Sequence, residues 1–241
     1  MIKYNTPQEL FTAICDKIRD KTNSNELINH QDIPDKIDKL TSNDIKLFID
    51  SAIQGKNTIC YSFNNTTITK ISSTIFNTTN LTNIDLPECT SICSMAFQNC
   101  TNLTTIDLPE CSSIGYSAFN SCTNLTTVNL PKCTTLGYQT FSGCYNLTTV
   151  NLPKCTSAGM GPGSENYGSF YNCNNLTIVI LGDGLVSNLP PMFGNTPIKN
   201  GTGYIYVPDN VLNEYKTNNP DYQFKPISEL PSNLKEEYGY E

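Results

Sequence analysis

The stretch Asn80-Leu-Thr-Asn-Ile-Asp-Leu-Pro-Glu-Cys89 decides the fold, because it recurs along the chain. Copies of the frame N-L-T-x-[IV]-[DN]-L-P-[EK]-C begin at 22-residue intervals, and a partial fifth copy follows; the starting residues are Asn102, Asn124, Asn146 and Asn175. A unit this short cannot bury its own apolar side, whereas stacked units bury one continuous core. The sequence therefore predicts a solenoid.

Each copy carries apolar residues in the pattern L-x-x-[IV]-x-L. Alternate side chains of a strand point to opposite faces, so these residues point inward and those between them form one exposed face. We expect short parallel strands here, ended by the Pro, and an irregular or short helical convex side. A second apolar position and a Phe complete the predicted core; these residues are Ile92, Ile114, Leu136 and Ala158, with Phe97, Phe119, Phe141 and Phe170.

Thr, Asn and Asp dominate the exposed strand positions, as in Thr104, Thr105 and Asp107. This face lacks the aromatic and Arg side chains of protein-binding hot spots. We interpret it as a solvated strand surface, with weak protein binding and carbohydrate binding as alternatives. Glu110 and Lys132 occupy the same position in successive repeats, so we expect an exposed ion pair that stabilises by at most about 1 kcal/mol.

The second half of a repeat, seen most clearly in Ser113-Ile-Gly-Tyr-Ser-Ala-Phe119, resembles the signature of the BspA-type bacterial leucine-rich repeats, L-P-x-x-[ST]-x-I-G-x-x-A-F-x-x-C. The resemblance extends over residues 68–207 and implies a leucine-rich-repeat solenoid. Members of that family are typically surface or adhesive proteins, so it also implies binding rather than catalysis. Cys93 departs from the signature, because the next repeats have Gly115 and Gly137 there.

Eight of the eleven cysteines fall into two ladders along the repeats: Cys89, Cys111, Cys133 and Cys155, then Cys100, Cys122, Cys144 and Cys173. Stacked rungs lie within the range of a disulfide, but their parallel Cβ vectors suit packing better than bridging. The sequence contains no C-x-x-C, which argues against zinc. We expect reduced thiols that pack as small core residues, and neither metal nor cofactor.

Residues 1–40 are predicted to form a small α-helical module. Thr6-Pro7-Gln8-Glu9 is a capping box with Pro at the first helical position. Apolar residues follow at helical spacing and are the predicted attachment residues: Leu10, Phe11, Ile14 and Ile18. The segment resembles a module of phage and prophage structural proteins, which implies attachment to other virion proteins. A helical cap on the first coil and contact between copies of the chain are alternatives.

The solenoid is predicted to extend over residues 80–182, with divergent first coils over 41–79, because the terminal units of repeat arrays are atypical. Residues 183–241 are predicted to form a C-terminal cap and tail. Ile178 and Ile180 are apolar at exposed strand positions, so we expect something to cover them, and the tail offers two apolar segments, residues 190–193 and 204–209. The second of these segments resembles the cap of BspA-type arrays. Residues 235–241 are polar, and we expect them to be loose or bound to a partner.

The fourth repeat is 29 residues long instead of 22, because of an insertion between Gly159 and Ser169. Such insertions form loops on one side of a solenoid and often bind, and Gly, Ser, Asn and Tyr are typical of adaptable recognition loops. A harmless insertion is the alternative. The predicted binding residues are the tyrosines around this loop and two apolar residues at exposed strand positions: Tyr116, Tyr138, Tyr145, Tyr167, Tyr171, Ile178 and Ile180.

The composition argues for a non-enzymatic protein. Fifteen basic and 22 acidic residues give a net charge of −7, which argues against nucleic acid as a partner. The sequence contains no apolar run of the roughly 20 residues that a membrane span needs. Its N-terminal residues lack the pattern of a secretory signal. The single histidine, His30, is not part of a catalytic motif.

We predict a phage virion component, made in the host cytoplasm, that decorates the head or tail. The N-terminal module would attach it, and the solenoid would face a host-cell surface protein or glycan. The first alternative is a BspA-type adhesin on a bacterial cell surface, and the second is a secreted glycan-binding module.

Overall fold

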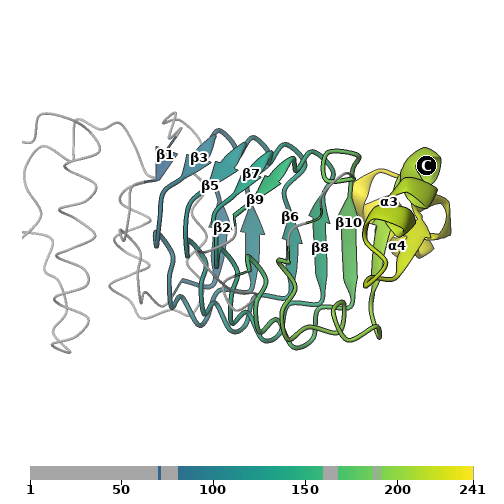
Figure 1. The fold of residues 1–241 in the computed structure, drawn as a ribbon. Coiled ribbons are helices and arrows are strands. Elements are labelled where there is room, and N and C mark those ends of the chain that lie inside the picture. The colour runs from purple at the N-terminus through teal and green to yellow at the C-terminus, as the bar shows by residue number, and fades with distance from the viewer. Residues whose placement is uncertain (1–69, 72–80, 160–167, 187–188, 190, 241) are drawn as a thin grey trace, which may run out of the picture.

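The computed structural model describes residues 70–71, 81–159, 168–186, 189 and 191–240. Stacked coils form a solenoid, and most coils contribute one strand to each of two parallel sheets (Figure 1). This confirms the predicted parallel-strand solenoid with repeats of 22 residues. Residues 1–40, with the predicted attachment residues Leu10, Phe11, Ile14 and Ile18, lie outside the described part of the chain, as does nearly all of 41–79.

Within the described residues, the larger sheet has seven strands in the order β12-β11-β10-β8-β6-β4-β2. Its register aligns the repeats, so that Ile84 pairs with Ile106 and Val128 with Val150. The strands are β2 (Asn83–Asp85), β4 (Thr105–Asp107), β6 (Thr127–Asn129), β8 (Thr149–Leu152), β10 (Ile178–Leu181), β11 (Tyr204–Val207) and β12 (Phe224–Pro226).

A second parallel sheet holds the apolar positions that follow the first cysteine ladder. Its strands have two residues each, with the second residue buried: β1 (Lys70–Ile71), β3 (Ser91–Ile92), β5 (Ser113–Ile114), β7 (Thr135–Leu136) and β9 (Ser157–Ala158). The sequence pattern identified the buried residues but not this sheet. The convex segment after it consists of turns, because residues such as Ser117 and Ser121 have positive φ angles of 51° and 61° that a right-handed helix excludes.

A ladder of phenylalanines runs along the centre of the core. Phe97, Phe119, Phe141, Phe170 and Phe193 stack with ring centroids 5.1–5.7 Å apart, and each is fully buried. Beside them, three thiols of the second cysteine ladder, those of Cys122, Cys144 and Cys173, donate to the Phe carbonyls of the preceding coil, at Sγ–O distances of 3.1–3.3 Å. All eight ladder cysteines are buried, as predicted. The thiols therefore help to join consecutive coils.

Glycine is required where the second-sheet turns of neighbouring coils approach each other. The N–H of Gly137 donates to the carbonyl of Ile114 at 2.7 Å. A Cβ atom at Gly137 would lie 2.4 Å from the backbone nitrogen of Tyr116. Because both contacts involve backbone, a side chain here can be accommodated only if the coils separate.

We expect Gly137→Ala to lower the free energy of unfolding by about 3 kcal/mol through this overpacking, measured by urea denaturation. Gly239→Ala is the control, because a Cβ there meets nothing within 4 Å and only the positive φ of 72° opposes it, at about 1 kcal/mol. Equal losses in the two variants would contradict the close-approach argument.

The C-terminal segment closes the end of the core. The 3-10 helix η4 (Asp209–Val211) leads into α3 (Leu212–Asn218), and η5 (Ile227–Glu229) precedes α4 (Ser232–Tyr238). From α3, the buried Tyr215 donates a hydrogen bond to the carbonyl of Gly182 at 2.8 Å and packs against Phe224. Within the described residues, no helix is long and apolar enough to cross a membrane.

Candidate recognition surface

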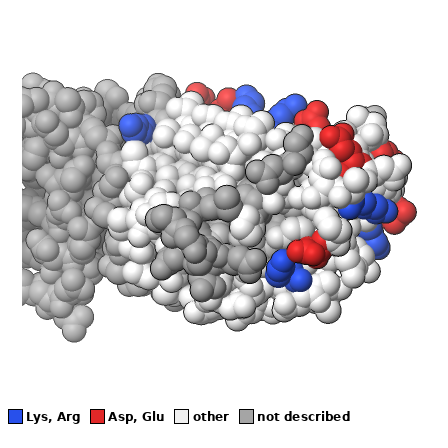
Figure 2. Space-filling model, viewed as in Figure 1, with Lys and Arg blue, Asp and Glu red and all other residues white. Residues whose placement is uncertain are grey.

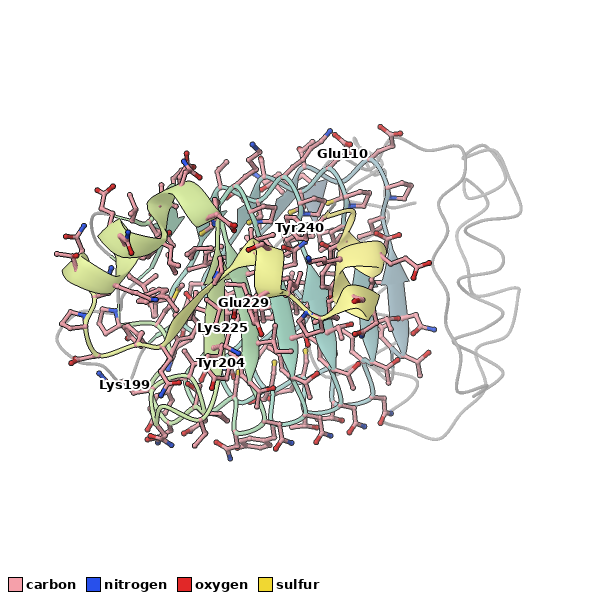
Figure 3. All side chains as sticks on the ribbon, turned by 90° about the vertical axis from the view of Figure 1, so that its right-hand side faces the viewer. Glu110, Lys199, Tyr204, Lys225, Glu229 and Tyr240 are labelled. Atoms are coloured by element: carbon pink, nitrogen blue, oxygen red, sulfur yellow. The ribbon has the colours of Figure 1, made fainter. Side chains whose placement is uncertain are left out.

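The C-terminal helix α4 folds back over the exposed face of the larger sheet (Figure 3). Ile180 and Tyr206, on β10 and β11, pack with Leu230 and Leu234 in a small apolar cluster outside the main core. Ile180 is 0% exposed, and Ile178 is half-buried against the same cluster. These strand residues therefore have a cover, but it comes from the chain itself. The prediction that Ile180 is a binding residue on the surface is therefore corrected, because no partner can reach this side chain while α4 is in place.

The end of the tail is also anchored. Tyr240 donates from its hydroxyl to Oδ1 of Asn151 at 2.9 Å, and Nδ2 of Asn151 donates to Oδ1 of Asn129 at the same distance. Burial raises the pKa of Tyr240 from its ordinary value of 10.0 to about 12, so this hydroxyl stays protonated and can donate even at alkaline pH. The expectation that residues 235–241 are loose or partner-bound is wrong for 235–240, which complete α4 and this anchor.

As a result, only part of the strand face is open. Asn151 on β8 is 2% exposed beneath the tail, whereas Thr105 and Asp107 on β4 remain exposed. On the open part, side chains form hydrogen bonds with the preceding repeat. The hydroxyl of Thr105 donates to Oδ1 of Asn83 at 2.6 Å, and that of Thr104 donates to the carbonyl of Thr82 at 3.0 Å. This arrangement fits a solvated strand surface, because neighbouring repeats already satisfy these hydroxyl donors.

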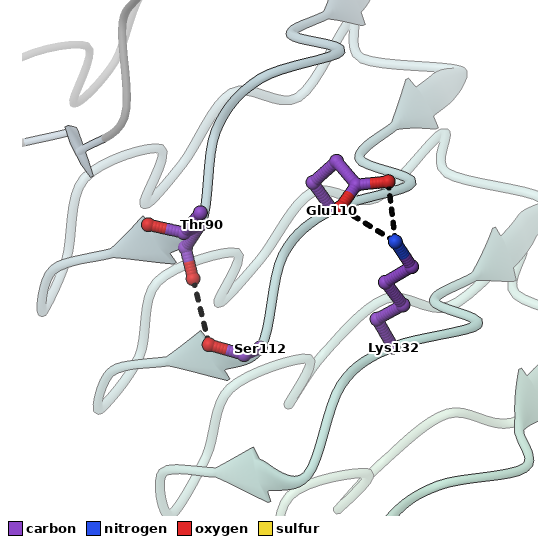
Figure 4. Close-up of polar contacts among 4 residues, drawn as sticks. All are labelled: Thr90, Glu110, Ser112 and Lys132. Atoms are coloured by element: carbon purple, nitrogen blue, oxygen red, sulfur yellow. Dashed lines mark hydrogen bonds and ion pairs between the residues drawn. The ribbon is translucent and has the colours of Figure 1, made fainter.

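Charged side chains lie mostly along the rim and around the C-terminal end in the view of Figure 2, which leaves a broad uncharged area between them. On the rim, Lys132 contacts both carboxylate oxygens of Glu110 at 2.6 Å, as predicted from the repeat register (Figure 4). Beside this pair, the hydroxyl of Ser112 donates to the carbonyl of Thr90 at 3.1 Å. Both side chains of the ion pair are well exposed, which limits its contribution to stability.

The predicted tyrosines fall into two groups. Tyr116 and Tyr138 follow successive strands of the second sheet and stack with ring centroids 4.2 Å apart. Tyr145 and Tyr171 lie in the turns after the phenylalanines; Tyr145 is 47% exposed, and the hydroxyl of Tyr171 accepts a hydrogen bond from Nδ2 of Asn195 at 3.3 Å. Tyr167 and residues 160–167 of the insertion lie outside the described residues.

A polar pocket of about 460 Å³, which was not predicted from the sequence, lies at the turns of the last two coils. Its lining is Asn172, Asn174, Asn195, Thr196, Pro197, Asn200 and Thr202. Two signals in the sequence could have indicated it. One is the local density of Asn, and the other is the uneven spacing of the last coil. Phe193 follows its stacking partner Phe170 by 23 residues, whereas Tyr204 follows its strand partner Ile178 by 26 residues.

The described residues offer little for catalysis. They contain no group of three His, Cys, Asp or Glu side chains that could hold a metal ion. Burial raises the pKa of Cys144 to about 12 and that of Cys155 to about 11. Because the thiolate is the nucleophile, these ladder thiols are unreactive at neutral pH and serve as packing groups.

The profile described as "BspA type Leucine rich repeat region" matches residues 69–164 and 112–215, with six copies. The chain belongs to the BspA-type leucine-rich repeat family. Proteins with this repeat generally act in recognition or adhesion rather than catalysis. No curated protein matches the sequence.

Three solved structures illustrate the similarity. The Treponema pallidum leucine-rich repeat protein is 22% identical over 70% of this chain and 85% of its own, with a TM-score of 0.47. The pneumococcal vaccine antigen PcpA is 12% identical over 70% of this chain and 41% of its own, with a TM-score of 0.49. A leucine-rich cell surface protein from Faecalibacterium prausnitzii is 14% identical over 76% of this chain and 90% of its own, with a TM-score of 0.29.

Proposed function

We propose that this chain is a non-enzymatic recognition protein, and that it is carried on a phage virion through residues 1–40 with the solenoid facing outward. Membership in the BspA-type family carries the recognition role. The geometry supports it, because the core is self-contained while Tyr145 and the amide-lined pocket lie on the surface. Support for the virion comes from the resemblance of residues 6–37 to a module of phage and prophage structural proteins.

The virion proposal is tested by locating the protein in a strain that expresses it. Particles are purified on a density gradient after phage induction, and peptides of the repeats are quantified by mass spectrometry in the particle and cell-envelope fractions. We expect the peptides to co-sediment with particles. Peptides in the envelope without particle association would instead identify a bacterial cell-surface adhesin, and peptides in neither fraction would also reject the virion role.

Attachment through the N-terminal module is tested by a matched pair of variants. Leu10→Ser with Ile14→Ser removes apolar residues from the predicted helix face, and Asp16→Ser with Lys17→Ser changes polar residues of the same segment. We expect the first variant to lose particle association and the second to keep it, with the same thermal midpoint for both. Retained association of the first variant would contradict attachment through this face.

A further inference from the structure

We infer that the pocket at the last two coils binds a neutral saccharide. The inference deepens the proposed recognition function by assigning a class of ligand to one site. Asn172, Asn174, Asn195 and Asn200 supply amides, Thr202 supplies a hydroxyl, and Pro197 supplies the only apolar side chain of the lining. The hydroxyl of the buried Thr196 is used within the turn, because it donates to the carbonyl of Phe193 at 2.7 Å and accepts from the N–H of Lys199 at 3.2 Å. The volume of about 460 Å³ falls within the range of about 300–1,000 Å³ typical of small-ligand sites.

The pocket exists because the last coil is longer on one side. Up to Phe193 the last coil keeps step with the coil before it, since Phe193 stacks on Phe170 and the N–H of Asn172 donates to the carbonyl of Gly194 at 3.0 Å. The strands are in step again at Tyr204, three residues later than an even spacing would place it. The surplus residues form a turn around Gly201, which has a φ of 75°, and this turn forms one wall of the pocket.

Hydrogen bonds between the coils orient the amides of Asn172, Asn174 and Asn195 without using all their polar atoms. Nδ2 of Asn195 donates to Oδ1 of Asn172 at 3.0 Å and to the hydroxyl of Tyr171 at 3.3 Å, so Oδ1 of Asn195 can still accept. In its favourable amide orientation, Asn174 donates to the carbonyls of Asn195 and Asn172 at 3.2 and 3.3 Å. Its own oxygen then remains as an acceptor. The site is therefore preorganised, which lowers the entropy cost of binding.

The chemistry of the lining selects a polyhydroxylated, uncharged ligand. A side-chain amide offers both a donor and an acceptor, and a sugar hydroxyl does the same, so adjacent sugar hydroxyls can pair with adjacent amides. Tyr145 lies in the turn one coil before Asn174, at the equivalent position in the strand register, and is 47% exposed. Tyr145 is not part of the pocket lining, but an exposed aromatic ring one coil away can pack against the apolar face of a sugar that extends beyond the pocket.

An anion or a cation fits less well, because all seven lining residues are uncharged. The cation nearest in sequence, Lys199, contacts Asp221 at 3.5 Å and lies 5.3 Å from the ring centroid of Tyr222. Its ammonium group is therefore already occupied outside the pocket. Charged ligands would lose hydration here without gaining an ionic partner.

Saturation-transfer-difference NMR tests the site on the full chain. The probes are the methyl glycosides of glucose, galactose, mannose and N-acetylglucosamine, with N-acetylneuraminic acid as the charged comparison and glycerol as a generic polyol. We expect saturation transfer to at least one neutral glycoside and none to the two comparison compounds. No transfer to any neutral glycoside, or equal transfer to N-acetylneuraminic acid or glycerol, would overturn the assignment.

Two substitutions locate the binding. Asn200→Ala removes one amide, and Asn195→Gly removes another while keeping its positive φ of 54° accessible. We expect each to weaken the glycoside affinity by about tenfold, which is the loss of roughly one net hydrogen bond. The matched control is Asn99→Gly, because Asn99 occupies the same turn position in an earlier coil with a φ of 61°.

Unchanged affinity in both pocket variants, or an equal loss in Asn99→Gly, would reject this location. The outcome is also separable from that of the broader proposal. The virion proposal assigns particle association to residues 1–40, so a chain that associates with particles but binds no glycoside would fail the saccharide inference alone. A chain that binds glycoside at this pocket without particle association would fail the virion proposal alone.

Discussion

Phe119→Ala is expected to lower the free energy of unfolding by about 4 kcal/mol, as measured by urea denaturation. Phe119 is fully buried and stacks between Phe97 and Phe141, at 5.1 and 5.3 Å. Truncation therefore removes a large apolar side chain and two aromatic contacts, and it leaves a cavity in the middle of the ladder. In a repeat array each coil is stabilised by its neighbours, so loss at a central rung weakens two interfaces at once.

Tyr145→Ala is the matched control, because it removes an aromatic ring of similar size from a position that is 47% exposed. We expect it to change stability by less than about 0.5 kcal/mol. If the two variants were equally destabilised, the phenylalanine ladder would not be the principal source of cohesion between coils.

Alkaline unfolding is the second large effect that we expect. Burial raises the pKa of Cys155 to about 11 and those of Cys111 and Cys144 to about 12, from an ordinary value of 9.0. Below pH 9 these thiols are protonated in both the folded and the unfolded chain. Between pH 9 and 11 the unfolded chain releases their protons while the folded chain keeps them, so the free energy of unfolding falls as the pH rises.

Each such thiol lowers the free energy of unfolding by about 1.4 kcal/mol for every pH unit above 9, until its own folded-state pKa is reached. Several ladder thiols act together, so we expect cooperative unfolding before pH 11. Circular dichroism at stepped pH measures the midpoint, and urea denaturation at pH 9.5 and 10.5 measures the slope. Cys144→Ala should make the slope shallower by about 1.4 kcal/mol per pH unit. An unchanged slope would show that the buried thiols do not cause the transition.

The regular features could be predicted because each is repeated. The 22-residue frame places equivalent residues in register, and Ile114, Phe119 and Cys122 are buried as their spacing indicated. The same register brought Glu110 beside Lys132. The two-residue strands of the second sheet could not be predicted, because a single apolar residue between turns has no periodicity to distinguish it from a loop.

The sequence by itself determined the solenoid, its parallel strands and its core, because stacking makes every coil repeat the contacts of the one before. Only the tertiary structure decided which surfaces are open. The tail covers Ile180 and joins Tyr240 to Asn151, 89 residues away. The amide pocket arises from three surplus residues in the last coil. The contacts of the tail do not recur along the chain, so no repeat spacing encodes them. The surplus residues of the last coil can be counted in the sequence, but only the fold shows that they form the wall of a pocket.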